Sequence, residues 1–117
     1  MSSFAAPATL VGHHLVNGKT HDGGNQFQSI SPADKRVVVG KFPTATAAEA
    51  NQAVAAARAA YPQWRRQSRV VRAELFDNLA QIIKRETDNL ARLMSWECGK
   101  IFNECRAEVI EGLHMVQ

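Results

Sequence analysis

The chain has 117 residues, of which 45% are hydrophobic and 21% charged, and its formal net charge is +3. This length suits one modest domain, and the composition is ordinary for a globular chain. No apolar run is long enough to cross a bilayer, and the start of the chain lacks the basic and apolar regions of a secretory signal. Two cysteines make no disulfide framework, so the sequence favours a reducing cytoplasm.

The first third of the chain is predicted to be β-structure after a flexible arm. Residues 1–9 are small and polar and are expected to form that arm. Residues 10–42 read as short β-hairpins, and Asn17-Gly18 is their strongest turn signal. Further turns are expected at residues 22–24 and 31–34, and strands at residues 26–30 and 36–42. Such hairpins are too small to fold alone.

Three helices are expected in the rest of the chain, at about residues 46–61, 68–98 and 102–117. Thr46 and Glu49 have the spacing of a capping box, which predicts the first helix start. Pro62 is expected to end that helix and to leave Trp64 in the following loop. Ser68 is a plausible N-cap for the second helix, and Gly99 is a plausible left-handed stop. As it stands the fold class is therefore α+β.

The second helix has one apolar stripe and must pack against another part of a protein. Its members recur at steps of three and four residues, with Glu86 on the same stripe: Val71, Leu75, Leu79, Ile82, Leu90 and Leu93. Ile83 and Met94 widen this stripe. The third helix carries a similar stripe, formed by Phe102, Cys105, Val109, Leu113 and Val116. Small hairpins cannot cover three striped helices, so the sequence predicts marginal stability for the isolated chain and a larger body that completes its burial.

A search for chemistry finds no catalytic and no cofactor-binding residue. Gly23-Gly24 lacks the spacing and the following helix of a phosphate-binding loop. The four histidines do not fall at zinc spacings and are expected in solvated or turn positions: His13, His14, His21 and His114. A basic cluster at the start of the second helix is interpreted as a solvated face, because no stacking aromatics are interleaved with it: Arg65, Arg66, Arg69 and Arg72.

Two carboxylates at the edge of the apolar stripe, Glu86 and Glu97, require a compensating donor or a cation. For Glu97 two interpretations stay open. One is a local capping or ion-pair role, and the other is contact with a cation or with a cofactor-binding domain. Cys98 and Cys105 are both expected to be reduced thiols, with Cys105 on the buried face of the third helix.

Four segments of the chain follow one another in a specific order and spacing: Val16-Asn17-Gly18-Lys19, Ser31-Pro32-Ala33, the helix AVAAARAAYPQW and Glu97-Cys98-Gly99-Lys100. Together they resemble the N-terminal quarter of an NAD(P)-dependent aldehyde dehydrogenase. The resemblance covers about residues 10–117. It has two departures: Cys98 replaces the threonine of the family's Glu-Thr-Gly-Lys, and Ser31 replaces the asparagine of its Asn-Pro-Ala.

The resemblance implies an oxidoreductase that converts an aldehyde to a carboxylic acid with NAD or NADP through a cysteine thioester. Residues 10–117 would be an incomplete N-terminal segment of the dinucleotide-binding domain in an α/β fold. The family's nucleophile, general base and nicotinamide pocket would lie beyond Gln117, so this chain alone is expected to be inactive and to bind no cofactor. Family members are usually homo-oligomeric, and their partner here would be a small aldehyde.

Two site hypotheses follow from the resemblance. A structural cation would be held by the backbone carbonyls of Ser29 and Ile30 and by the carboxylate of Glu97. Glu111, on the third helix, would face the substrate tunnel. Two rival functions also remain: a stand-alone α+β protein-interaction module without catalysis, and a weaker one, a nucleic-acid binder through the arginine cluster. Our expectation is no nucleic-acid and no membrane partner.

Overall fold

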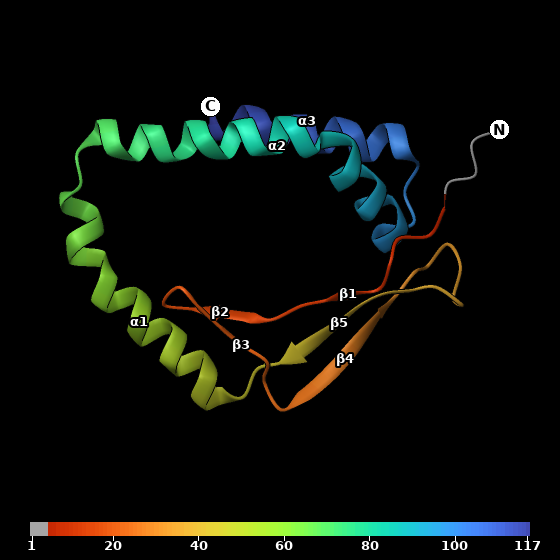
Figure 1. Cartoon of the computed structure of the whole chain (residues 1–117), viewed down its shortest axis with the longest axis horizontal. Coiled ribbons are helices and arrows are strands. Elements are labelled where there is room, and N and C mark those ends of the chain that lie inside the picture. Colours follow the sequence, from red (N-terminus) through yellow and green to blue (C-terminus); the bar gives the residue numbers. More distant parts are fainter. Residues whose placement is uncertain (1–4) are drawn as a thin grey trace.

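The computed structural model describes residues 5–117, which form an open ring of strands and helices (Figure 1). The strands are β1 (Leu10–Val11), β2 (His14–Val16), β3 (Lys19–His21), β4 (Asn25–Ile30) and β5 (Val38–Thr44). The helices are α1 (Ala47–Arg66), α2 (Arg69–Cys98) and α3 (Phe102–Val116). The α+β class expected from the sequence is confirmed.

Part of the expected flexible arm falls on residues 1–4, which lie outside the described residues. Two residues of the remainder of the arm make hydrogen bonds to distant parts of the chain. The indole N–H of Trp96 donates to the Ala5 carbonyl at 3.2 Å, and the Thr9 hydroxyl donates to the Val38 carbonyl at 3.2 Å. Both partners are distant in sequence, and the local composition gives no sign of them.

The strands form two small sheets. In the first, β5 is central: β1 runs parallel to it, with Leu10 opposite Gly40, and β4 runs antiparallel on its other side. The second sheet is the β2–β3 hairpin. Asn17 and Gly18 turn it with positive φ values of 52° and 72°, as a type I′ turn requires. The parallel pair was not foreseen, because parallel strands are joined by long connections that carry no turn signal.

Helix α1 begins at the predicted capping box. The Thr46 backbone N–H donates to the Glu49 carboxylate at 2.7 Å, and the Glu49 N–H donates to the Thr46 hydroxyl at 3.3 Å. The hydrogen bond from the Thr46 backbone lowers the pKa of Glu49. The expected end at Pro62 is wrong, because α1 continues through Pro62 and Trp64 to Arg66. Proline removes one helical hydrogen bond and its ring clashes with the preceding turn, which can kink a helix without ending it.

Helix α2 keeps both of its predicted ends. The Ser68 side chain accepts the Val70 N–H at 3.1 Å, and Gly99 adopts the left-handed conformation with a φ of 71°. The Gly99 N–H donates to the Ser95 carbonyl at 2.9 Å, which closes the last turn. These signals were readable in the sequence because a cap and its partner lie within a few residues of each other.

Helices α2 and α3 form an antiparallel pair, and the packed face of α2 includes only the widened edge of the predicted stripe, Ile83 and Met94. The buried residues of α2 are Ala80, Thr87 and Ala91, and Ala91 packs with Cys105 and Val109 of α3. This face is the predicted stripe shifted by one residue, or about 100° around the helix. Small side chains let α3 approach closely. The predicted stripe instead keeps five members at 39–53% exposure: Val71, Leu75, Leu79, Ile82 and Leu90.

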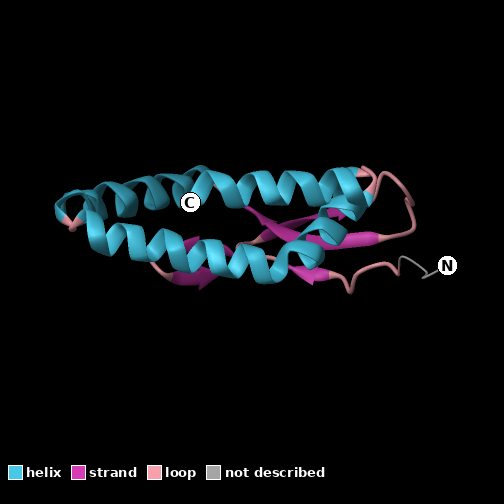
Figure 2. Ribbon diagram, turned by 90° about the horizontal axis from the view of Figure 1, so that it is seen from above, coloured by secondary structure: helices cyan, strands magenta, loops and turns pink. Residues whose placement is uncertain are grey.

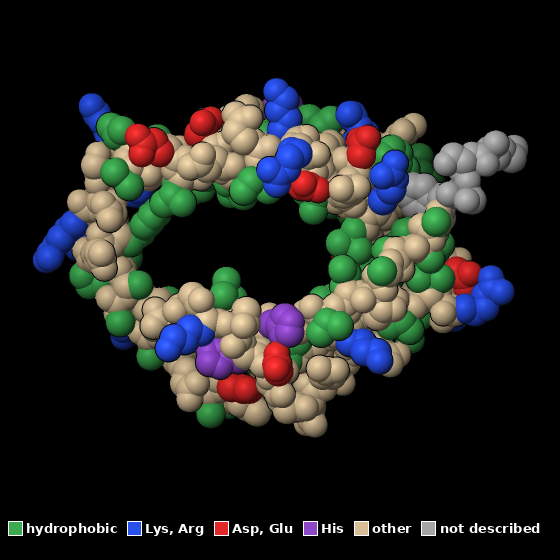
Figure 3. Space-filling model, viewed as in Figure 1, with side chains coloured by type: hydrophobic (Ala, Val, Ile, Leu, Met, Phe, Trp, Pro, Cys, Tyr) green, Lys and Arg blue, Asp and Glu red, His purple; other side chains and the backbone are tan. Residues whose placement is uncertain are grey.

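The molecule is thin and has an opening at its centre. Its extents are 52 × 36 × 16 Å. Figure 2 shows the molecule edge-on, with its shortest dimension vertical. The radius of gyration is 17.3 Å, whereas a compact domain of this length has about 13 Å. Figure 3 shows the opening with hydrophobic side chains along much of its edge. Within residues 5–117, no helix has the length and apolar character of a membrane span.

Candidate functional site

The polar site with the most support from the sequence lies where the end of β4 meets the end of α2. The Ser29 hydroxyl donates to Oε1 of Glu97 at 3.4 Å, although the two residues are far apart in sequence. A register shift between Ser29 and Ile30 marks a β-bulge at the same place. Bulges interrupt the ladder and redirect the groups of one strand. The structure therefore brings the carboxylate of Glu97 next to the irregular end of β4.

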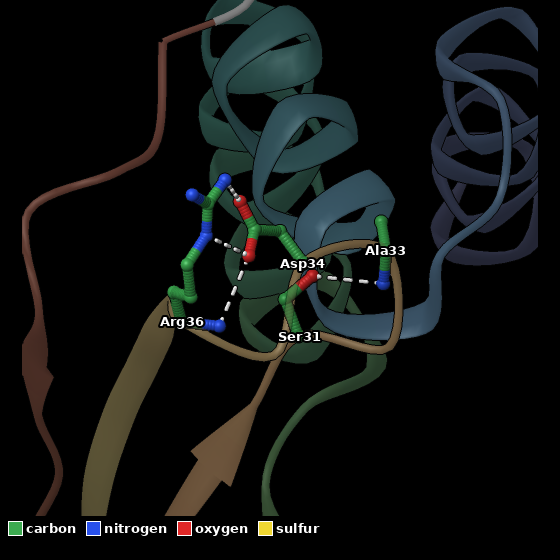
Figure 4. A network of polar contacts seen from close by, with 4 residues as sticks. All are labelled: Ser31, Ala33, Asp34 and Arg36. Carbon is green, nitrogen blue, oxygen red and sulfur yellow. Dashed lines mark hydrogen bonds and ion pairs between the residues drawn. The ribbon is translucent and has the colours of Figure 1, made fainter.

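The turn after β4 is fixed to the last turn of α2 by Ser31. Its hydroxyl donates to the Trp96 carbonyl at 2.6 Å and accepts the Ala33 N–H at 3.3 Å, and the side chain is fully buried. Carbonyls in the last turn of a helix have no partner within the helix. Ser31 thus satisfies one of these carbonyls and at the same time shapes its own turn (Figure 4).

The far side of this turn is held by an ion pair between Asp34 and Arg36 (Figure 4). The Arg36 side chain donates to both carboxylate oxygens at 2.9 and 2.8 Å, and its backbone N–H donates to Oδ1 at 3.0 Å. The side-chain hydrogen bonds, followed by the backbone one, lower the pKa of Asp34 to about 2. Both residues are on the surface, so this pair has a local shaping role.

The donor set beside Glu97 suits a hard cation better than a transition metal. The Glu97 carboxylate and the Ser29 hydroxyl are oxygen ligands, which alkali and alkaline-earth ions prefer. Among residues 5–117, no group of three or more histidine, cysteine or acidic side chains lies close enough to hold a metal ion. A cation here would therefore depend on main-chain oxygens, as the Ser29, Ile30 and Glu97 hypothesis requires.

Glu86, the other carboxylate on the predicted stripe, has local partners. Asn89 donates to it at 3.0 Å and the Arg85 guanidinium at 2.9 Å. The hydrogen bond from Asn89, and then that from Arg85, lowers the pKa of Glu86. Glu86 is therefore compensated within its own helix and needs no cation.

The two cysteines lie in contrasting surroundings near the α2–α3 connection. Cys105 is fully buried in the contact between α2 and α3, as the sequence predicted, and burial raises the pKa of its thiol. Cys98 is the exposed last residue of α2. A reactive thiolate usually sits beside a positive charge or at a helix N-terminus. Neither position has the character of an activated nucleophile.

The acidic residues of α3 lie on its surface. Glu111 is 75% exposed, and its nearest described partner is His114, whose Nδ1 lies 3.8 Å from the carboxylate. Glu108 pairs with Lys100, and this hydrogen bond raises the pKa of the lysine. Arg106 reaches across to Asp88 of α2 at 2.9 Å. Glu111 is thus left available to a partner outside this chain.

The histidines do not form a site. His13 lies 2.6 Å from Asp22 on the surface. His14 and His21 face each other across the hairpin and line a pocket of about 230 Å³ against α1. The ring nitrogen Nε2 of His14 is buried without a hydrogen-bond partner, so the expectation of a solvated or turn position is wrong for His14. Its ring lies close to Gly23, which follows the end of the same hairpin.

The sequence did not identify a groove between α1 and α2. It has a volume of about 390 Å³ and almost entirely apolar walls, formed by Trp64, Leu75, Phe76, Asn78, Leu79 and Ile82. The available signal was the apolar stripe of α2, for which the sequence predicts burial that a larger body completes. The inclusion of Trp64 depends on the continuation of α1 beyond Pro62.

The family model and the relatives that match this chain all belong to one class of enzyme. The model of the aldehyde dehydrogenase family matches residues 19–117. The chain is 31% identical over 103 residues to 1-pyrroline-5-carboxylate dehydrogenase of Staphylococcus saprophyticus, covering 88% of this chain and 20% of that protein. It is 30% identical over 117 residues to the mitochondrial methylmalonate-semialdehyde/malonate-semialdehyde dehydrogenase (acylating) of Rattus norvegicus, covering 99% of this chain and 22% of that protein.

The fold agrees with the sequence matches. The crystal structure of NAD-dependent aldehyde dehydrogenase from Sinorhizobium meliloti has a TM-score of 0.86 and 33% identity, over 91% of this chain and 22% of that one. The structure of Thermus thermophilus 1-pyrroline-5-carboxylate dehydrogenase has a TM-score of 0.87 at 27% identity. The chain spans about a fifth of the length of the curated relatives that it matches.

Proposed function

Because the chain belongs to the aldehyde dehydrogenase family, we propose that it forms the leading segment of an enzyme that oxidises an aldehyde to a carboxylic acid with NAD or NADP. The observation that carries this proposal is the agreement of sequence and fold over the same residues, with 33% identity and a TM-score of 0.86 to an NAD-dependent relative. In this proposal residues 10–117 begin the dinucleotide-binding domain of a cytoplasmic homo-oligomer. The complete protein would be the active species.

The chemistry proposed for the complete protein is attack of a thiolate on the aldehyde, hydride transfer to the nucleotide, and hydrolysis of the thioester. Neither cysteine of this chain suits the first step. Cys105 is buried and its pKa is raised, which keeps the thiol protonated. Cys98 lies at the C-terminal end of α2, whose dipole is negative. We therefore propose that this chain scaffolds the enzyme and that its 117 residues alone are inactive.

The test is to read the gene beyond the codon for Gln117 and to assay both products. We expect a cysteine-bearing continuation, aldehyde-dependent formation of NAD(P)H by the complete product, and no such activity from the 117-residue chain. A stop codon, with a cooperatively folded product that lacks dehydrogenase activity, would favour the stand-alone interaction module. Binding of DNA or RNA that weakens steeply with salt would favour the nucleic-acid alternative.

We further propose that the complete protein holds a cation between Glu97 and the carbonyls of Ser29 and Ile30. The hydroxyl of Ser29 already reaches Glu97 at 3.4 Å, so the two segments are close enough to share an ion. Crystals of the complete protein soaked in rubidium are expected to show an anomalous peak beside Glu97. Glu97→Gln should remove the peak, whereas Ser29→Ala should keep it because the carbonyl remains. No peak in the unmodified protein would exclude the site.

Loss of this cation should also lower stability. At a hundredfold excess over its dissociation constant, an ion that binds only the folded state contributes about 2.7 kcal/mol. We expect the stabilisation by added salt to be specific to one cation and absent in Glu97→Gln. Glu104→Gln, which changes an exposed carboxylate on α3, serves as the control. Equal salt responses in the two variants would contradict the proposal.

For Glu111 we propose a position at the entrance of the substrate tunnel. Its carboxylate is 75% exposed here and lies on the α3 surface away from the buried Cys105 and Val109. In the complete enzyme, Glu111→Ala is expected to change the kcat/KM ratio between charged and neutral aldehydes by about tenfold, or about 1.4 kcal/mol. Glu104→Ala is the matched control. An unchanged ratio would contradict the assignment.

A further inference from the structure

A pair of histidines that the proposed function does not use lies between the β2–β3 hairpin and α1. His14 and His21 stand directly opposite each other in the register of the hairpin. Side chains in such a pair share one face of the hairpin, with their Cβ atoms about 4.5–5.5 Å apart. The turn at Asn17 and Gly18 sets this register, so the two imidazoles are held side by side although they are not neighbours in sequence.

The face that carries both histidines is turned toward α1. His14 and Val16 are half-buried, whereas Leu15 between them is 72% exposed, which is the alternation of a strand with one covered face. Both histidines line the pocket of about 230 Å³, and so does Glu49 of α1. Figure 3 shows histidine and acidic side chains close together in this part of the ring. The pocket therefore combines two imidazoles with a carboxylate.

The ring of His14 has a free nitrogen at this place. Its Nε2 is buried and has no hydrogen-bond partner among residues 5–117. Buried polar atoms are normally paired, so an unpaired one requires an explanation. In the neutral ring that carries its proton on Nδ1, the other nitrogen has a lone pair that can bind a metal ion. His21 is exposed, so its ring can turn toward that of His14.

Glu49 contributes negative charge to the pocket rather than a further ligand. Its carboxylate already accepts hydrogen bonds from the Thr46 backbone N–H at 2.7 Å and from the Thr46 hydroxyl at 2.8 Å. These hydrogen bonds lower the pKa of Glu49, and the charges of His14 and His21 add to this effect. The carboxylate is therefore ionised at neutral pH, and it lies close enough to the two rings to attract a cation between them.

We propose that His14 and His21 form a binding site for a divalent transition-metal ion, with water molecules in its other coordination positions. Neutral imidazole suits Zn²⁺, Ni²⁺ and Cu²⁺, whereas the oxygen ligands beside Glu97 suit harder ions. Within residues 5–117, metal-binding side chains do not gather in a group of three or more, so the chain supplies two ligands and the ion exchanges with solvent. The four histidines as a set still form no site. The inference does not depend on the proposed function.

Calorimetric titration of the chain with Ni²⁺, without an affinity tag, tests the site. We expect one saturable site whose affinity falls at least about tenfold in His21→Gln and in His14→Gln. His13→Gln removes an imidazole next to His14 that pairs with Asp22 instead, so it should leave the affinity unchanged. Because His21 is exposed, its variant decides the matter even if His14→Gln does not fold. Equal affinities of His13→Gln and His21→Gln would overturn the proposal, as would the absence of saturable binding.

The position of the ion is tested in crystals of the complete protein soaked in nickel, and this experiment decides if the isolated chain is insoluble. An anomalous peak at the nickel absorption edge is expected between the rings of His14 and His21. It should disappear in His21→Gln and remain in His13→Gln. Nickel found only elsewhere, for example at the exposed Cys98, would overturn the proposal. A nickel peak in a protein without dehydrogenase activity would support this site and count against the proposed function alone.

Discussion

Replacing Val109 with aspartate is expected to separate α3 from α2 and to destabilise the chain by about 4 kcal/mol or more. Val109 is only 7% exposed and packs with Ala91 and Cys105, which are fully buried. An aspartate there would lose its hydration among the apolar side chains of this cluster. Because the rest of the chain has a small core, the loss should unfold most of α3.

The measurement is urea unfolding followed by far-ultraviolet circular dichroism, in this chain and in the complete protein. Met115→Asp is the matched control, since it places the same charge on the same helix at a residue that is 82% exposed. We expect it to cost less than about 0.5 kcal/mol. If the two variants had similar midpoints, α3 would not be packed through Val109.

Gly99→Ala is expected to destabilise the chain by about 2–3 kcal/mol. Gly99 has a φ of 71°, and a left-handed backbone costs a residue with a side chain about 1–2 kcal/mol. A Cβ atom at this position would also lie 2.9 Å from Cγ of Pro32, so the turn that follows β4 would have to shift. The end of α2 would thereby lose its fit against that turn.

Two other glycines separate these causes. Gly18→Ala has nearly the same φ, 72°, but no atom within 4 Å of the added Cβ, so it should show the backbone cost alone. Gly112→Ala lies within α3 in open space and should stabilise the chain by about 0.5–1 kcal/mol through helix propensity. The free energy of unfolding should be lowest for Gly99→Ala, higher for Gly18→Ala and highest for Gly112→Ala. A Gly99→Ala variant that is no less stable than Gly18→Ala would show that the contact with Pro32 is absent in solution.

The elements whose signals are local were predictable from the sequence. A cap side chain binds a donor two or three residues away, so Thr46 and Ser68 show where α1 and α2 begin. Asn17-Gly18 identifies a hairpin for the same reason. The prediction that α1 ends at Pro62 was wrong because a proline can either end or only kink a helix. Which of the two occurs depends on the contacts of the following turn.

The sequence predicted the polar site between β4 and α2 only in part. Ser29, Ile30 and Glu97 were named from a family resemblance, and the structure places Ser29 and Glu97 within 3.4 Å of each other. Nothing in the local sequence connects β4 to the end of α2. The buried hydrogen bond from Ser31 to the Trp96 carbonyl, which holds the two together, was not foreseen. Such a contact depends on two chain segments meeting in space, and it leaves no periodic pattern.

The sequence by itself determined the helices, their caps, the hairpin turn and the family, because these follow from neighbouring residues and from their order. Only the tertiary structure decided which face of α2 is buried. Two apolar stripes run along that helix one residue apart, and their hydrophobicity does not distinguish them. The stripe with Ala80 and Ala91 packs within the chain because small side chains let α3 approach closely, which leaves the bulky stripe with Leu79 and Ile82 exposed.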